Sequence, residues 1–400
     1  MVTLTETPTI RRSAETNNIM SYSKRCLGDL TSFVESGITP RGGNSSYVEA
    51  GPQLIRSQNV LMGSLSLDNV VRISPETFES MRRAQVLCDD VLLNITGASI
   101  GRACRIGIDL GNAVVNQQVA VIRTQKDILS PAFLAYVLRT ESLQNTILSS
   151  QTDASQGCFN RQKIRALEIP LPPLSEQRRI VEILDQADTL RQQRRQADQL
   201  SRRILPALFL EMFGNPNSAH DRWPSKPITE VCRPRQWPTI SGNQLLPEGY
   251  PAFGANGQIG YHHSFNHEHP TIVITCRGAT CGTISLTPPK CYLTGNAMAL
   301  DDLDETLVSK EFMVAFLECR GLDDTITGTT QPQITRTNLE KVRIPLVPRD
   351  LLFRFTENSK SLTSARSAST SSVTSLEILF QTILHRAFDG SLTDKWREGT

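Results

Sequence analysis

The sequence predicts an α+β protein built as an internal repeat, with two strand-rich globular parts that are each followed by a long helical segment. Residues 155–173 (SQGCFNRQKIRALEIPLPP) resemble residues 330–348 (TQPQITRTNLEKVRIPLVP). Residues 90–101 (DVLLNITGASIG) likewise resemble residues 271–282 (TIVITCRGATCG). Each proline-containing exit from a globular part leads into a long segment with apolar residues at helical spacing.

The two resemblances describe one repeat once a small length difference is allowed. The exits match at an offset of 175 residues and the upstream glycines at an offset of 181, because the second copy is six residues shorter between them. The matched residues are Gln156 and Gln331, Ile169-Pro170-Leu171 and Ile344-Pro345-Leu346, Gly97 and Gly278, and Gly101 and Gly282. One tripeptide would be weak evidence, whereas this ordered set indicates a duplicated unit.

Apolar runs and turn residues predict the elements of each globular part. We expect strands at residues 91–93, 114–122, 272–274 and 342–346, and short helices at residues 133–148 and 310–317. The four matched glycines suit tight turns in which the backbone approaches another group closely.

The first long segment, from Ser175 to Phe213, predicts a helix with a narrow apolar stripe of the coiled-coil kind. Gly214 follows the last periodic residue, where a C-terminal cap belongs, and Pro206 should kink the final third. Arginines in this segment are interleaved with acidic residues, which favours a solvated or partner-facing surface. The expected helix seam comprises Ile180, Ile183, Ala187, Leu190, Ala197 and Ile204.

The second long segment, residues 349–388, has apolar faces at both ends but a polar middle. Between Ser359 and Glu377, 11 of the 19 residues are Ser or Thr, which are mediocre helix formers. Taken alone, this stretch could be a flexible linker. Its position in the repeat, opposite the better helix, favours a helix that packs against the first one.

Composition excludes some classes of protein without choosing a function. Lys and Arg number 42 against 40 Asp and Glu, so the net charge of +2 does not by itself indicate nucleic-acid binding. No apolar run approaches the roughly 20 residues of a membrane-spanning helix. Nine cysteines without a CxxC pair, and no secretory signal, favour reduced thiols in the cytoplasm.

The junction between the first globular part and the first helix resembles that of a known family. Residues 169–185 (IPLPPLSEQRRIVEILD) are similar to the junction sequence of the specificity (S) subunits of type I restriction-modification systems. Further resemblances to this family lie at residues 53–60, 97–102, 253–260, 277–282 and 294–296. The similarity covers nearly the whole chain, in order and twice over.

The resemblance implies two target recognition domains separated by two long antiparallel coiled-coil helices, in a pseudo-twofold repeat. The expected divisions are a first recognition domain at 1–172, a first spacer helix at 173–214, a second recognition domain at 215–348, a second spacer helix at 349–390 and a tail at 391–400. The second helix departs from the family pattern, since it has RDLLFR where the first has a Glu-Gln-x-x-Ile-Val signature. This departure puts its part in partner docking in doubt.

The sequence contains none of the catalytic motifs that the associated reactions need. No adenine-methyltransferase loop, phosphate-binding loop or nucleophile elbow is present. We therefore expect a non-catalytic subunit. The family resemblance implies that it binds DNA, and two similar but unequal domains predict a bipartite, asymmetric target. The resemblance implies partnership with two methyltransferase subunits and with restriction/translocase subunits, which would hold S-adenosylmethionine, ATP and Mg. The alternative is the recognition portion of a fused restriction enzyme or methyltransferase with an unrecognised catalytic site.

One group of histidines and cysteines could suggest zinc, but its spacing matches no zinc module. A polar surface loop is the favoured interpretation, and we expect no metal. The residues are His262, His263, His267, His269, Cys276, Cys281 and Cys291.

Polar residues at the predicted strand ends are the candidate DNA contacts, because Arg suits guanine, Asn and Gln suit adenine, and Ser and Thr adapt to either. For each one, a turn or strand-end hydrogen bond is an equal alternative. The first domain offers Arg56, Gln58, Asn94, Thr96, Ser99, Arg102 and Gln156. The second offers Asn256, Arg277, Thr280, Gln331, Gln333 and Thr335.

Overall fold

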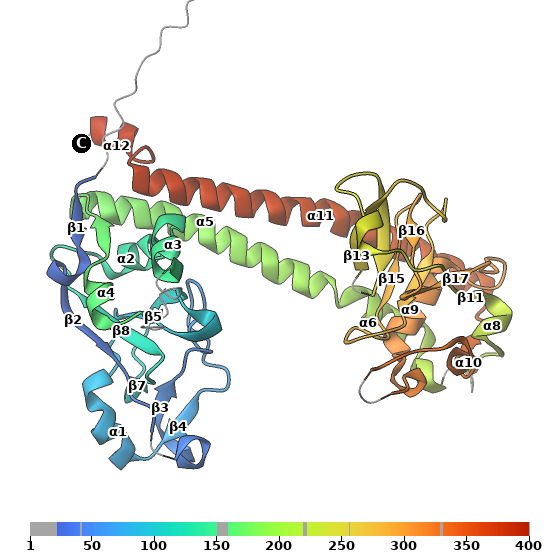
Figure 1. Cartoon of the computed structure of the whole chain (residues 1–400), viewed down its shortest axis with the longest axis horizontal. Helices are drawn as coiled ribbons and strands as arrows, with labels where there is room; N and C mark the ends of the chain where they lie inside the picture. The colour runs from blue at the N-terminus through green and yellow to red at the C-terminus, as the bar shows by residue number, and fades with distance from the viewer. Residues whose placement is uncertain are drawn as a thin grey trace, which may run out of the picture. The chain divides into compact units, whose positions relative to one another are not determined.

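The computed structural model describes residues 22–40, 42–149, 159–218, 222–255, 257–328 and 331–399. The chain divides into two compact units, one of residues 1–192 with 375–400 and one of residues 193–374 (Figure 1). Within the described residues, no helix is both long enough and apolar enough to span a bilayer.

The described part of the first unit contains three sheets. A four-stranded antiparallel sheet has the order β2 (Thr31–Ser36), β8 (Val119–Thr124), β5 (Val91–Asn94), β6 (Ala103–Arg105). A second sheet has the order β4 (Val71–Ile73), β3 (Tyr47–Ile55), β7 (Ala113–Val115), and β3 and β7 are parallel. The third pairs β1 (Lys24–Cys26) with β9 (Glu168–Pro170). The short helices are α1 (Pro75–Met81), α2 (Pro131–Val137), α3 (Glu141–Ser149) and α4 (Arg161–Arg165).

The second unit repeats this arrangement strand for strand. Its four-stranded sheet has the order β11 (Arg233–Gln236), β17 (Ala297–Asp301), β14 (Ile272–Thr275), β15 (Ile284–Leu286). Its three-stranded sheet has the order β13 (Gly257–His262), β12 (Tyr250–Gly254), β16 (Tyr292–Leu293), with β12 and β16 parallel. The third sheet pairs β10 (Ser225–Pro227) with β18 (Arg343–Pro345). The short helices are α8 (Ile228–Val231), α9 (Lys310–Arg320) and α10 (Arg336–Leu339).

This correspondence confirms the duplicated α+β fold. Strands β5 and β14 are buried along their whole length, which explains their uninterrupted apolar runs. In the first unit, α2 packs Phe133 and Leu134 into the same core as β5. In the second, Phe209, Phe312 and Phe355 lie in one core with β14, and the ring centroids of Phe209 and Phe312 are 5.5 Å apart.

Two predicted elements are each divided in the structure. The expected strand 114–122 is two strands, β7 and β8, separated by a turn at residues 116–118 where three polar residues interrupt the apolar run. The expected helix 133–148 is α2 and α3, which break around Thr140. The Thr140 hydroxyl donates to the carbonyl of Val137 (2.7 Å), so local side-chain bonding competes with helix continuation there.

The first long segment forms α5 (Leu174–Ser201) and α6 (Ile204–Phe213), interrupted at residues 202–203. A proline ring clashes with the carbonyl four residues earlier, and for Pro206 that residue is Arg202. The interruption therefore falls where Pro206 disturbs the helix. Gly214 has φ 80° and donates its N–H to the carbonyl of Leu210, which confirms the expected cap.

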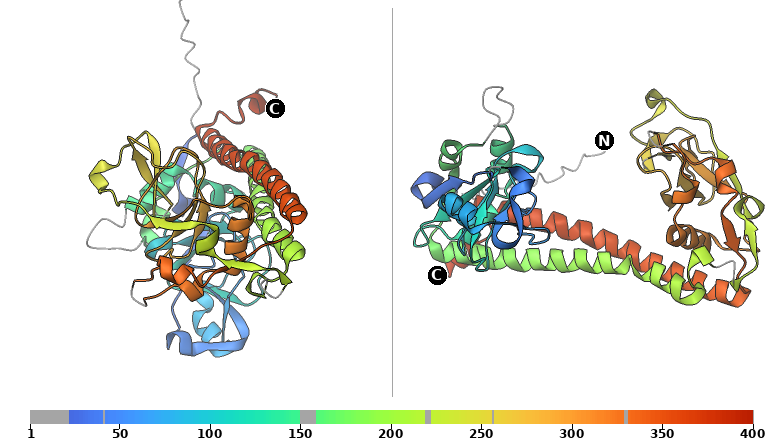
Figure 2. Two further views of the ribbon diagram at one scale, coloured as in Figure 1. Left: turned by 90° about the vertical axis from the view of Figure 1, so that its right-hand side faces the viewer. Right: turned by 90° about the horizontal axis from the view of Figure 1, so that it is seen from below.

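The second long segment is a single helix, α11 (Arg349–Asp389), so the linker interpretation of its Ser- and Thr-rich middle is wrong. A short helix, α12 (Asp394–Glu398), follows within the predicted tail. In the first unit α5 and α11 run antiparallel and side by side (Figure 2): Arg191 pairs with Glu377, whereas Glu176 near the start of α5 contacts Thr393 beyond the end of α11.

The expected apolar seam of the first helix is only partly correct. Ile180 lies in the core of the first unit, and Ile183 and Ala187 are half-buried. Leu190 and Ile204 are 57% and 46% exposed, and Ala197 is exposed, so the prediction is wrong at these three positions. The buried face of α5 instead comprises Glu176, Gln177, Ile180, Leu184, Asp188 and Arg191. An apolar pattern could not find it, because four of these six residues are polar or charged.

The charged residues on this face are paired with each other, which is what allows their burial. Asp188 accepts hydrogen bonds from Arg139 (2.9 Å) and Arg191 (2.7 Å). Burial alone would raise the pKa of Asp188, but the two guanidinium groups lower it overall. The ring of Phe380 on α11 lies 4.8 Å from the guanidinium carbon of Arg139 and 4.1 Å from that of Arg191. Arg191 is thus buried within the chain, not on the solvated or partner-facing surface that was expected.

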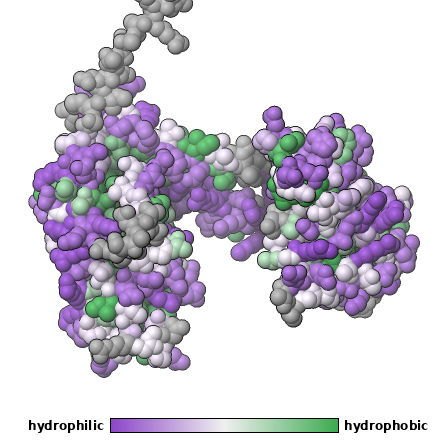
Figure 3. Space-filling model, in the orientation of Figure 1, coloured by the Kyte–Doolittle hydropathy of each residue, from purple (hydrophilic) through white to green (hydrophobic). Residues whose placement is uncertain are grey.

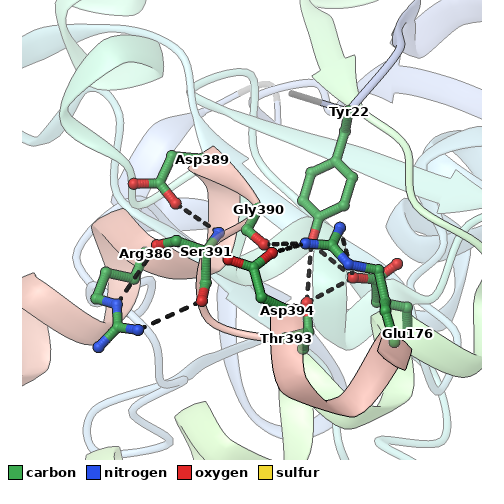
Figure 4. Close-up of polar contacts among 9 residues, drawn as sticks. Tyr22, Glu176, Arg386, Asp389, Gly390, Ser391, Thr393 and Asp394 are labelled. Atoms are coloured by element: carbon green, nitrogen blue, oxygen red, sulfur yellow. Dashed lines mark hydrogen bonds and ion pairs between the residues drawn. The ribbon is translucent and has the colours of Figure 1, made fainter. Parts of the chain in front are cut away.

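A second polar cluster joins both ends of the described chain to the start of α5 (Figure 4). The carboxylate of Glu176, only 3% exposed, accepts hydrogen bonds from the hydroxyls of Tyr22 (2.9 Å) and Thr393. It also forms an ion pair with Arg397 of α12 (3.3 Å). Gln177, the next residue, accepts from the Ser130 N–H (2.8 Å). Both residues of the Glu-Gln signature are therefore buried in contacts within the chain.

We predict that Glu176→Ala lowers the free energy of unfolding of the first unit by about 3 kcal/mol, because it removes one partner of a buried, hydrogen-bonded ion pair. Glu182→Ala is the matched control on the same helix, since Glu182 and Arg179 form an exposed pair worth at most about 1 kcal/mol. Denaturant unfolding of the full chain measures both. Equal effects of the two substitutions would contradict a structural role for Glu176.

A second prediction concerns alkaline pH. Burial, assisted by the hydrogen bond to Glu176, raises the pKa of Tyr22 to about 12, whereas an unfolded tyrosine has a pKa of about 10. The folded state thus holds the phenol proton more tightly, and its stabilising effect is complete below pH 10 and lost as the pH rises toward 12. Comparing unfolding of the wild type and of Tyr22→Phe across this range should show a steeper alkaline loss in the wild type.

Candidate nucleic-acid interface

In the first unit, three segments meet at the end of the buried strand β5. They are the loop after β3 (56–59), the turn after β5 (95–102) and the turn between β7 and β8 (116–118), and together we call them the strand-end frame. Two backbone hydrogen bonds close the turn after β5, from the N–H of Asn94 to Arg102 O (2.8 Å) and from that of Gly101 to Asn94 O (2.9 Å). Three more join this region to its neighbours: Ile95 to Gln118 O (2.9 Å), Asn116 to Ile55 O (3.0 Å) and Phe159 to Ile95 O (3.0 Å).

The second unit builds the same frame at the end of β14, from residues around 255, 276–283 and 294–296. Its five equivalent N–H groups bond as follows: Thr275 to Thr283 O (2.8 Å), Gly282 to Thr275 O (2.8 Å), Cys276 to Asn296 O (3.2 Å), Thr294 to Phe253 O (3.1 Å) and Ile334 to Cys276 O (3.0 Å). The repeat therefore extends to individual backbone hydrogen bonds.

The matched glycines are required by the backbone of the frame. Gly97 and Gly278 have φ of 75° and 89°, and Gly101 and Gly282 have φ of 84° and 91°, values that side chains disfavour. At Gly101 a Cβ would also lie 2.5 Å from Gln144 Oε1 on α3, whose amide nitrogen donates to the Gly101 carbonyl (2.8 Å). The close approach expected at this turn is therefore to α3.

Asn94, a candidate reader, instead holds the frame together. It is completely buried, and its amide nitrogen donates to Ser57 O (2.8 Å) and to Ser99 Oγ (3.1 Å). The second unit makes the corresponding bridge with hydroxyl groups, because Thr275 and Thr280 both donate to Ala255 O (3.1 and 2.7 Å). The proposal that Asn94 contacts bases is therefore wrong, and Ser99 and Thr280 are engaged in the frame.

Two further candidates, Thr335 and Arg56, also form contacts within the protein. Thr335 caps α10 by accepting the Asn338 N–H (3.2 Å), although its side chain is exposed. Arg56 is half-buried, donates to Asn69 O (3.1 Å) and lies with its guanidinium carbon 5.7 Å from the ring centre of Tyr47. Their first role is to shape loops.

The remaining described candidates lie on the frame or, for Gln331 and Gln333, in a neighbouring segment that is hydrogen-bonded to it. Gln58 and Arg102 are exposed in the first unit, where Thr96 is half-buried. Arg277, Gln331 and Gln333 are exposed in the second, and Arg277 and Gln333 are neighbours in a β-bridge. Gln156 and Asn256 lie outside the described residues. On the face shown in Figure 3, each unit is mainly hydrophilic, so polarity alone does not single out these residues.

Sequence reasoning missed the third segment of the frame, the turn Asn116-Gln117-Gln118. Gln118 accepts from the Ser57 hydroxyl (2.9 Å) and from the Asn116 amide (3.3 Å), while Gln117 is exposed. The signal was present, because three polar residues interrupt the predicted strand 114–122. This turn is also the counterpart of residues 294–296, which carried part of the family resemblance.

Two of the histidines considered above, His262 and His267, are buried in protein contacts, whereas His263 and His269 are exposed. His267 is buried between Asn266 Oδ1 (2.7 Å) and Asp301 Oδ1 (2.9 Å), and His262 contacts Ser264. Across the described residues, no three His, Cys, Asp or Glu side chains gather as a metal site would require.

The chain thus carries two unlike copies of one strand-end frame. Comparison with known proteins names the class. Residues 66–199 and 220–350, more than half of the chain, match the family described as "Type I restriction modification DNA specificity domain". The chain therefore belongs to the type I restriction-modification DNA specificity family.

Individual relatives agree with this assignment. The specificity subunit of the type I restriction enzyme EcoBI from Escherichia coli is 29% identical over 150 residues, which is 36% of this chain and 31% of that protein, so the match spans about a third of the relative. The crystal structure of the type I restriction-modification S subunit from M. genitalium is 16% identical, with a TM-score of 0.61 over 94% of this chain and 98% of that one. A chain from a type I R-M assembly study is 18% identical, with a TM-score of 0.50 over 93% and 99%. These solved structures share the fold.

We predict that Asn94→Ala lowers the free energy of unfolding of the first unit by about 2 kcal/mol, because the substitution removes a completely buried amide and the Ser57 carbonyl loses its donor. Gln58→Ala is the control, because Gln58 follows Ser57 in the loop after β3 and is exposed. This substitution should change the free energy of unfolding by no more than about 0.5 kcal/mol. Denaturant midpoints of the full chain provide the comparison. A stable Asn94→Ala protein would argue against the buried amide as the brace of the frame.

Proposed function

We propose that this chain is the non-catalytic specificity subunit of a type I restriction-modification complex. It reads a bipartite, asymmetric DNA target and directs methyltransferase and restriction subunits to it. One observation carries the proposal: the two units share a strand-end frame bond for bond but present different exposed side chains on it. Two similar but unequal surfaces suit two unequal half-sites.

The exposed residues have the chemistry that base reading needs. The amide groups of Gln58, Gln331 and Gln333 can pair with the donor and acceptor of an adenine edge, and Arg102 and Arg277 can pair with guanine. The frame beneath Gln58, Arg102 and Arg277 is braced by buried groups, so these side chains start from fixed backbone positions. The segment that carries Gln331 and Gln333 is held to the second frame by the hydrogen bond from the Gly278 N–H to the Pro332 carbonyl (3.1 Å). Fixed positions favour discrimination between bases over simple adhesion to phosphates.

The near-neutral chain suits a subunit that relies on partners. Affinity for DNA depends largely on neutralised phosphates, and a net charge of +2 supplies few of them. We therefore assign much of the phosphate contact, together with S-adenosylmethionine, ATP and Mg, to two methyltransferase subunits and the restriction/translocase subunits. The exposed apolar residues Leu190 and Ile204 on the long helices give such partners apolar surface to bury.

The test is to assemble the chain with its cognate methyltransferase subunits and map the methylated adenines. Replacing residues 1–172 with the corresponding segment of a relative should change one half of the methylated sequence and leave the other half intact. The reason is that each frame is complete within its own unit. The wild-type complex, mapped in parallel, provides the reference target.

Two controls make this test decisive. The isolated chain, given S-adenosylmethionine and DNA, should transfer no methyl group, and transfer would support the fused-enzyme alternative. A wild-type complex that methylates without sequence preference would refute the proposed function. Simultaneous change of both half-sites in the chimaera would refute independent reading by the two units.

A further inference from the structure

The turn between β7 and β8 differs in sequence from its counterpart in the second unit. In the first unit it reads Asn116-Gln117-Gln118, and in the second Thr294-Gly295-Asn296. Gln117 thus occupies the position at which the second unit has a glycine. The flanking backbone hydrogen bonds are nevertheless the same in both units.

The turn in the first unit is rigid on both sides of Gln117. Asn116 Oδ1 accepts the Gln118 N–H (3.2 Å), and the Asn116 carbonyl accepts the Val119 N–H (3.1 Å). Gln118 is bonded to Ser57 through its side chain and to Ile95 through its carbonyl. Asn116 and Gln118 therefore both use their hydrogen-bonding groups to hold the turn to the other two segments of the frame.

Gln117 itself is exposed and forms no hydrogen bond with the residues that the structure describes. It stands on the buried strands β7 and β8, whose ends fix the turn. An exposed, unengaged amide on a braced backbone can meet a ligand at little cost in folding free energy. Gln58 and Arg102 are the exposed polar residues of the other two segments.

In the second unit, neighbouring residues fill the space that a side chain at this position would need. A Cβ on Gly295 would lie 2.7 Å from Thr239 Oγ1 and 2.9 Å from the Trp237 carbonyl, so no side chain fits without rearrangement. The Gly295 carbonyl also accepts a hydrogen bond from the Gln236 amide (3.1 Å). Residues 237–239 thus cover the tip of this turn, which the first unit leaves open at Gln117.

We propose that Gln117 is a specificity-determining residue for the first half-site, and that it reads one base edge for which the second unit has no equivalent reader. A glutamine amide donates and accepts together, which matches the N6 and N7 groups of adenine in the major groove. The proposal rests on the proposed function, because it assigns one contact within the same interface. It adds a physical origin for the difference between the two half-sites.

The experiment uses the complete methyltransferase complex and maps methylated sequences for Gln117→Ala and Gln117→Glu. Gln117→Ala should reduce discrimination at one position of the first half-site by roughly 5- to 150-fold, the range for one bidentate base contact. Gln117→Glu should move the preference at that position from adenine toward cytosine, whose N4 amino group donates to a carboxylate. The second half-site should be unchanged in both variants.

Asn112→Ala is the matched control, since Asn112 is exposed at the opposite end of β7 and should leave the target unaltered. Unfolding midpoints equal to the wild type would show that the turn is intact in each variant. An unchanged target in both Gln117 variants would overturn the proposal, as would a uniform loss of binding with every base preference retained. Failure of the wild-type complex to methylate a specific sequence would instead refute the proposed function.

Discussion

Satisfying the backbone at the ends of two buried strands is the constraint on which this fold depends. Strands β5 and β14 are apolar on both faces, so the polar groups where they end must find partners away from water. Each unit meets this need by bonding a turn and two loops to the strand end, and one buried side chain, Asn94 or Thr275, fastens the loop from the parallel pair. The interface is therefore a consequence of strand burial: the groups that terminate the strand also position the exposed residues.

The helical part of the first unit depends on buried charge, not on an apolar seam. Asp188 and Arg191 would be costly to bury singly, and they are tolerated because Arg139 and Glu377 complete the network around Phe380. Such a network fixes the register of α5 against α11 more strictly than a leucine seam would. A shift of one helical turn would leave a buried charge without its partner. In the second unit the position of Glu176-Gln177 is taken by Leu351-Leu352, with Leu352 in the core, so the missing signature there is a change of internal packing.

The features that could be predicted from the sequence are those that depend on neighbouring residues in the chain. The repeat, the buried strands 91–93 and 272–274 and the cap at Gly214 were predictable, because apolar runs and glycine conformations act over a few residues. The α5 face that carries Asp188 and Arg191 was not, because its burial depends on partners 49 and 186 residues away in the chain. The same limit applies at the interface. An asparagine that braces a loop and a glutamine that faces solvent have similar side chains, and only their neighbours distinguish Asn94 from Gln117.

Duplication with a shared frame also explains how one chain can hold two specificities at little structural risk. Asn94 and Thr275, which brace the two frames, are buried, and the matched glycines supply the positive φ angles of the turns. Exposed positions such as Gln117 and Arg277 can then differ between the units without disturbing the strands beneath them. At Gly295 the frame itself would leave room for a side chain, and the neighbouring segment 237–239, which lies outside the frame, excludes it. Under the proposed function, specificity resides in side chains and covering loops, and stability resides in the repeated backbone.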